Sequence, residues 1–191
     1  MNHSNNLSII QLTAKNRTTI NWASGTSTEI FIFPREASFA ERNFLFRIST
    51  ATVEADESTF THFAGITRHL MVLKGEMELN HESQYSKHLK AFDQDTFSGE
   101  WKTSSRGRVT DFNLMLQNGM EGCLAHQFVS KGETLSIHGN SDYHFVFLAE
   151  GAAIYHADKK VDKSDLLWIP NGMSILIQSV TDCDWILIKV L

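Results

Sequence analysis

Two predicted β-strands carry the charged and polar side chains best suited to bind a small polar ligand. Successive side chains of a strand point to opposite sides, so Arg47 and Ser49 share one face. The same alternation places Asp111 and Asn113 together on a later strand. An arginine among Phe and Ile residues must reach solvent or an acidic partner, and a guanidinium can hold a carboxylate through two hydrogen bonds. The pattern predicts a site for a small carboxylate-bearing metabolite.

Other residues complete this candidate site. Asp111 is the expected partner of Arg47 or Arg68, and two guanidinium groups facing one carboxylate would select an anion. The competing interpretation, weighed about equally, is a structural ion pair that fixes strand register. For the aromatic members, an ordinary core role is the simpler interpretation. The predicted ligand-binding set is Trp22, Thr28, Glu29, Arg47, Ser49, Arg68, His69, Phe97, Asp111 and Asn113.

The sequence contains no catalytic or metal-binding motif. No Ser-His-Asp order, nucleophile elbow, phosphate-binding Gly loop or paired-carboxylate motif stands out. A His-x-His pair, which would suit a divalent metal, is absent, and the nine histidines are scattered. We therefore predict no catalytic residue, no metal and no cofactor. One question stays open, namely whether strands bring together His126, His138, His144 and His156 of the second half.

Composition excludes several classes of protein. The 191 residues include 17 Lys and Arg against 22 Asp and Glu, for a net charge of -5, and no basic cluster occurs. This balance argues against binding to nucleic acid. Two cysteines are too few for a disulfide framework, and the apolar runs are too short to span a membrane. With no targeting signal at the start, we expect a cytoplasmic protein.

Hydrophobic periodicity predicts an all-β fold with little helix. Apolar residues alternate with period two and stop at Gly, Asn, Asp or Ser clusters, as in a sandwich or barrel. The best helix candidate, a weak one, covers residues 83–90. Strands are predicted at residues 29–33, 44–53, 68–73, 110–116, 124–129, 133–137, 143–148, 152–156, 165–169, 174–179 and 185–190.

An internal similarity indicates two lobes. The segments HLMVLKGEMEL (69–79) and HFVFLAEGAAIY (144–155) share a His-led apolar strand, a Gly turn and a second strand. The second segment leads into an apolar strand that ends at Pro170-Asn-Gly, similar to the second conserved stretch of a cupin barrel. Residues 92–99 are the loosely matching counterpart in the first lobe. We predict an N-terminal lobe over 1–118 and a C-terminal lobe over 119–191.

Four segments in order resemble the successive blocks of the HutD/Ves family. They read NWASGTSTEI (21–30), FRISTATV (46–53), FTHFAGITRHLMVLKG (60–75) and VTDFNLM (109–115). The resemblance implies a double-lobed, cupin-type (RmlC-like) β-barrel or sandwich, that is a bicupin, in the bacterial cytoplasm. It brings no established catalytic activity.

The resemblance also implies a role. Family members are linked to control of histidine utilisation or to stress responses, and some are suspected of sensing a metabolite. The leading hypothesis is therefore a sensor or regulator that binds a small anion and has weak or no enzymatic activity. The alternative is a metal-dependent cupin enzyme, of the isomerase or dioxygenase type, acting on a small polar substrate. A purely structural module is a third interpretation, and a homodimer is compatible with the sequence.

Overall fold

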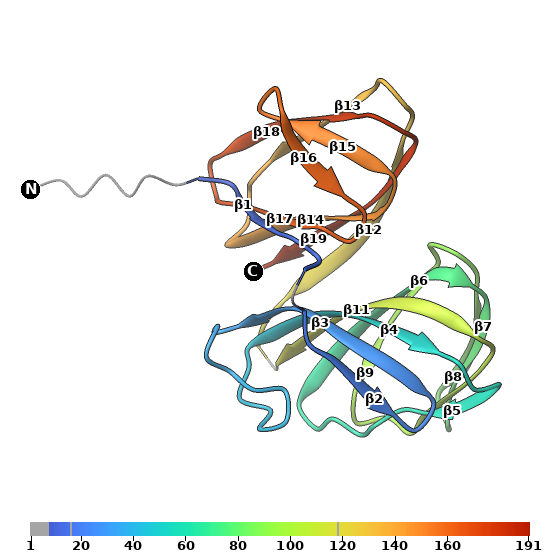
Figure 1. The fold of residues 1–191 in the computed structure, drawn as a ribbon. Helices are drawn as coiled ribbons and strands as arrows, with labels where there is room; N and C mark the ends of the chain where they lie inside the picture. Colours follow the sequence, from blue (N-terminus) through green and yellow to red (C-terminus); the bar gives the residue numbers. More distant parts are fainter. Residues whose placement is uncertain (1–7, 16, 118) are drawn as a thin grey trace, which may run out of the picture. The chain divides into compact units, whose positions relative to one another are not determined.

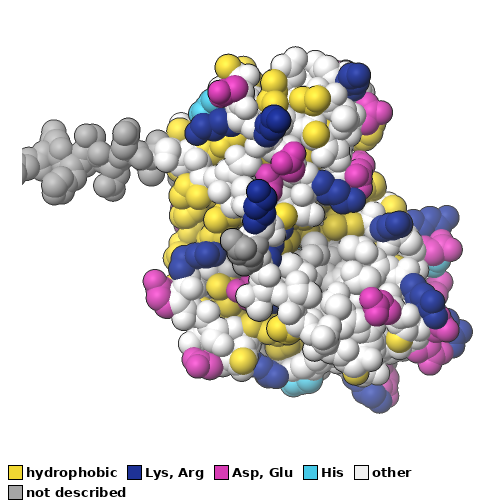
Figure 2. All heavy atoms as spheres, viewed as in Figure 1, with side chains coloured by type: hydrophobic (Ala, Val, Ile, Leu, Met, Phe, Trp, Pro, Cys, Tyr) yellow, Lys and Arg dark blue, Asp and Glu magenta, His cyan; other side chains and the backbone are white. Residues whose placement is uncertain are grey.

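The computed structural model describes residues 8–15, 17–117 and 119–191. Within these ranges the chain forms β-strands and no helix (Figure 1). The described residues accordingly hold no helix long and apolar enough to cross a membrane. On the face seen in Figure 2, Lys and Arg side chains lie among Asp and Glu side chains rather than in one block.

The described chain divides into two units. One, here called the central unit, lies between residues 17 and 120; the other, the terminal unit, combines residues 8–15 with residues 121–191. The predicted N-terminal lobe, residues 1–118, included this first segment. In the structure, strand β1 (Ile10–Leu12) pairs with β17 (Leu166–Ile169), and this pairing places it in the terminal unit.

The central unit consists of two antiparallel sheets. In order across the first sheet, the strands are β2 (Thr19–Trp22), β3 (Gly25–Phe33), β4 (Phe46–Val53), β11 (Val109–Gln117), β6 (Ile66–Gly75) and β9 (Gln94–Ser98). The second sheet has the order β5 (Glu57–Thr59), β10 (Thr103–Arg106), β7 (Met77–His81) and β8 (Tyr85–Leu89).

The terminal unit has the same plan. Its first sheet contains β1, β17, β14 (Tyr143–Glu150), β19 (Cys183–Val190) and β12 (Gly122–Val129). Its second sheet contains β13 (Thr134–His138), β18 (Ser174–Ser179), β15 (Ala152–Tyr155) and β16 (Lys159–Asp162). The order β4-β11-β6-β9 in the central unit corresponds to β12-β19-β14-β17 here, so the structure confirms the internal repeat.

Each unit buries a core between its two sheets. In β7 the buried and exposed residues alternate strictly, which is the signature of a strand with one face on the core. Leu70 of β6 and Leu79 of β7 meet in the core of the central unit. Trp185 of β19 and Ile177 of β18 meet in that of the terminal unit. Among the described residues, the strand pairings give two-sheet sandwiches that do not close into barrels.

The predicted helix at residues 83–90 is wrong. Residues 85–89 form β8, which pairs with β7 at the edge of its sheet. Tyr85, Ser86, Lys87 and His88 are all exposed, so this strand lacks the apolar alternation that identifies a half-buried strand. Pairing with β7, rather than local pattern, determines its conformation.

His144 on β14 should make the fold sensitive to acid. The side chain is 3% exposed, and burial together with the charge of Lys189 lowers its pKa. Below about pH 6.5, the ordinary pKa of a histidine, His144 binds a proton more readily in the unfolded chain than in the folded chain. Stability therefore falls as pH decreases. Urea unfolding at pH 7.5 and pH 5.5 should show a smaller loss in His144→Leu than in the wild type. His62→Leu, at an exposed position, should behave as the wild type; an unchanged loss in His144→Leu would contradict the assignment.

Candidate anion-binding site

Three strands of the central unit place the polar residues in cross-strand rows. Arg47 of β4 and Arg68 of β6 both pair with Met115 of β11, which lies between them. In the next row, Ser49 pairs with Asn113. Residues paired across a sheet point to the same face, so these side chains converge. The structure thereby confirms the faces predicted from strand alternation.

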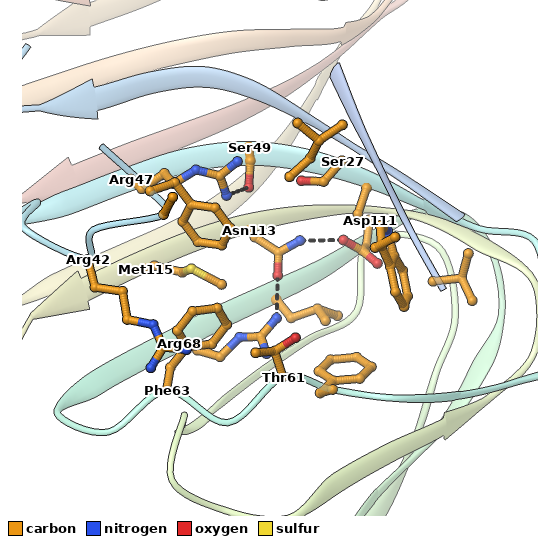
Figure 3. A pocket seen from close by; sticks show the side chains of 18 of the residues that line it. Ser27, Arg42, Arg47, Ser49, Thr61, Phe63, Arg68, Asp111, Asn113 and Met115 are labelled. Carbon is orange, nitrogen blue, oxygen red and sulfur yellow. Dashed lines mark hydrogen bonds between the residues drawn. The ribbon is translucent and has the colours of Figure 1, made fainter. Parts of the chain in front are cut away.

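This face forms the floor of a cavity of about 260 Å³ (Figure 3). Aromatic and aliphatic side chains form much of its wall, and the charged groups lie within this apolar surround. The charged side chains that line the cavity are Arg42, Arg47, Arg68 and Asp111. The remaining lining residues are Ile20, Trp22, Ser27, Phe39, Ala40, Ser49, Ala51, Val53, Thr59, Phe60, Thr61, Phe63, Leu70, Asn113 and Met115.

Arg68 is a buried cation enclosed by aromatic rings. It is 7% exposed, and its guanidinium carbon lies 4.8 Å from the ring centre of Phe60, 5.3 Å from that of Phe97 and 5.9 Å from that of Phe63. Burial lowers its pKa to about 10, while Asp111 opposes the shift. The group is therefore charged at neutral pH. Its buried Nε has no hydrogen-bond partner among the described residues, which leaves a donor of the guanidinium unused.

Asn113 links Arg68 to Asp111. The Arg68 Nη2 donates to Asn113 Oδ1 at 3.3 Å, and Asn113 Nδ2 donates to Asp111 Oδ1. Figure 3 shows Asn113 between the other two side chains, with a dashed line to each. Asp111 is 2% exposed, and burial raises its pKa to about 7 against the opposing effects of Arg68 and Asn113. The carboxyl group thus changes charge near neutral pH.

Of the two arginines offered as partners of Asp111, Arg47 pairs with Glu29 instead. Its Nε donates to Glu29 Oε2 at 3.0 Å and its Nη1 donates to Ser49 Oγ at 2.9 Å, so it does not pair with Asp111. Glu29 lies opposite Ser49, next to a register shift in β3, and this brings its carboxylate within reach. The Arg47 guanidinium also stacks on Phe39 at 4.1 Å. With its charge already paired, Arg47 supports the site more than it offers a free donor.

Loops complete the cavity on the side away from the sheet. Arg42 has a positive φ of 55° and its guanidinium stacks on Phe63, 4.8 Å from the ring centre. The Phe63 backbone lies close to Gly99, where a Cβ would meet the Phe63 carbonyl oxygen at 2.6 Å. Gly99 therefore allows the loop that carries Phe63 to approach the end of β9.

Four members of the predicted set do not line the cavity. His69 follows Arg68 on β6 and so faces the other side of the sheet, where its Nδ1 lies 2.9 Å from Thr96 Oγ1. Thr28 faces the same opposite side and bonds to Thr19. Phe97 is a core residue whose ring packs on His81 and lies 5.3 Å from the guanidinium carbon of Arg68. Glu29 acts through Arg47, as described above.

Several of the lining residues that sequence reasoning missed come from loops. Phe39, Arg42, Phe60 and Phe63 lie outside the strands, where no periodic pattern shows which way a side chain points. Ser27 could have been found, because it pairs with Ala51 on the face that carries Arg47.

Two histidines of the second half have hydrogen-bond partners of their own. His126 pairs with Asp184 at 2.8 Å, and His138 bonds to Ser174 at 2.9 Å. In the part of the chain that the structure describes, no group of three or more His, Cys, Asp or Glu side chains is placed to hold a metal ion. The donor set for the metal-dependent alternative is thus not assembled among these residues.

Comparison with known proteins assigns the family. The HutD family model matches residues 14–187. The chain belongs to the HutD family. A search of curated proteins gave no significant match to this HutD-family protein.

Solved structures support the same conclusion about the fold. A conserved protein of unknown function, PA5104 from Pseudomonas aeruginosa PAO1, is 21% identical, with a TM-score of 0.81 over 96% of this chain and 99% of that one. HutD from Pseudomonas fluorescens SBW25, in a structure described as a formate condition, is also 21% identical, with a TM-score of 0.72 over 96% and 100%. The Escherichia coli pirin YhhW, in complex with nickel(II), is 16% identical, with a TM-score of 0.71 over 95% and 98%.

These likenesses confirm the predicted fold class. The HutD-family protein has an all-β, double-lobed cupin fold, built here from two sandwiches.

Proposed function

We propose that this HutD-family protein binds a small anionic metabolite in the central unit and acts in the cytoplasm as a sensor or regulator. The observation that carries the proposal is Arg68, a buried cation that lines the cavity and whose Nε donor has no hydrogen-bond partner among the described residues. An unpaired buried donor is costly in a folded protein, and a ligand carboxylate or similar anion would satisfy it.

The charges around the cavity favour the same class of ligand. Three guanidinium groups line it, and the carboxyl groups in reach are Asp111, which is half-protonated near pH 7, and Glu29, which is paired with Arg47. The surplus is positive although the chain has a net charge of -5. The volume of about 260 Å³ suits a small molecule, and the aromatic wall suits a ligand with an apolar body.

The biological role rests on the family. Its link to histidine utilisation and stress responses makes intermediates of histidine breakdown the first ligands to test. The partner that we propose is therefore a small carboxylate-bearing metabolite, and no catalytic step is assigned.

A thermal-shift screen tests this proposal. Urocanate, histidine, formylglutamate and formate are each titrated to millimolar concentration at constant ionic strength, since salt alone changes stability. At least one carboxylate should raise the unfolding temperature, because a ligand that binds only the folded state stabilises it. The corresponding amides, which lack the carboxylate charge, should have no effect. If none of these acids shifts the transition at millimolar concentration, the proposal of an anion sensor is wrong.

A further inference from the structure

We propose that anion binding in this cavity is coupled to proton uptake by Asp111, so that the site releases its ligand as pH rises. This inference rests on the proposed function, and concerns its regulation. Asp111 and Arg68 are both more than nine-tenths buried on one cavity floor, and Asn113 bridges them. Asp111 is the counter-charge of Arg68 when the cavity is empty.

A bound anion competes with Asp111 for this role. The ligand would lie beside the Arg68 guanidinium, bringing a second negative charge into a cavity that Asp111 already lines. Like charges in an apolar surround repel strongly, because little water screens them. A proton on Asp111 removes the repulsion, and the protonated carboxyl can still be held by Asn113.

The other charged groups around Asp111 do not replace it as the titrating group. On β6, Arg68 remains a cation. On β4, Arg47 is paired with Glu29 of β3, and Arg42 stacks on Phe63 in the loop region. His69 lies on the opposite face of β6, and burial lowers its pKa. No other lining residue ionises between pH 5.5 and pH 8.5.

The pKa of Asp111, raised by burial to about 7, sets the range of this response. If only the protonated form accepts the anion, the apparent Kd scales with the inverse of the protonated fraction. The apparent Kd should then increase about tenfold between pH 6 and pH 8. The number of protons taken up for each anion should rise from near zero to nearly one over the same range.

Isothermal titration calorimetry with formate and methanesulfonate tests the coupling. Both probes keep a charge of minus one throughout this range, so any pH dependence belongs to the protein. Titrations at pH 6, 7 and 8 in buffers of different ionisation enthalpy give both the Kd and the protons taken up. The wild type should show the tenfold change and the uptake. Asp111→Asn should bind at pH 8 about as tightly as at pH 6, without proton uptake.

Several outcomes would overturn the coupling. Binding of either probe with a pH-independent Kd and no proton uptake would exclude it while leaving the anion-sensor proposal intact. A full pH dependence in Asp111→Asn would assign the proton to another group. If neither probe binds at any pH, the coupling fails together with the anion site itself. The wild-type proton uptake decides the question even if Asp111→Asn does not fold, and His69→Gln, on the opposite face, should keep the wild-type response.

Discussion

Replacing Arg68 with alanine is expected to weaken binding of a carboxylate ligand by about ten- to 150-fold. This range corresponds to about 1.5 to 3 kcal/mol, the contribution of a hydrogen bond to a charged group. The variant should still fold, because Asp111, left without its cation, can take up a proton instead of remaining a buried charge. Calorimetric titration with the best ligand from the screen, alongside circular dichroism, measures both effects.

Two further variants separate the guanidinium from its charge. Arg68→Lys keeps a cation but lacks the planar fork, so it should recover only part of the affinity. Arg106→Ala removes an exposed arginine that pairs with Glu57 at 2.8 Å, and it should bind as the wild type does. Wild-type affinity in Arg68→Ala would show that the ligand binds elsewhere.

The stability of Asp111→Asn relative to that of the wild type is expected to increase as pH rises from 4 to 8. The folded-state pKa of about 7 lies above the ordinary value of 3.8, so the folded chain holds a proton that the unfolded chain has lost. The contribution of Asp111 to the stability of the wild type is therefore fully present below about pH 4 and is lost as pH rises through 7. The difference between these two pKa values corresponds to a change in unfolding free energy of about 4 kcal/mol at most.

The comparison between the two proteins isolates Asp111. His144 and His69, whose pKa values burial lowers, change stability in the opposite direction, but they do so equally in both proteins. Urea unfolding at intervals between pH 4 and pH 8 gives the difference in unfolding free energy. A difference that stays constant with pH would mean that Asp111 ionises in the fold as it does in water. Such a result would remove the electrostatic basis for the proton coupling.

Strand alternation predicted the part of the site that depends on local geometry. Period two is sufficient to place Arg47 with Ser49 and Asp111 with Asn113, because no tertiary information enters that step. The same rule excludes His69 from the face of Arg68, although the predicted set included both. Alternation does not determine which side chains pair, and it did not reveal that Arg47 of β4 pairs with Glu29 of the neighbouring strand β3.

The rest of the site depends on tertiary structure. Arg42 and Phe63 come from loops that a sequence pattern does not orient, and they meet only when β3, β4 and β6 assemble. The fold class was predictable because short strands recur along the whole chain and the repeat is visible. The edge strand β8 was not, because an exposed polar strand has the composition of a loop or a weak helix.

The pairing of β1 with β17 bears on the order in which the protein can fold during synthesis. Ile10 is opposite Trp168, and the entire central unit lies between them in the chain. A nascent chain can therefore form the sheet that carries Arg68 and Asp111 before β17, the partner of β1, has been synthesised. The terminal unit, by contrast, cannot close until β19, in the interior of its sheet, has left the ribosome. The central unit, with the cavity lined by Arg68 and Asp111, is thus the first part of the molecule that can fold.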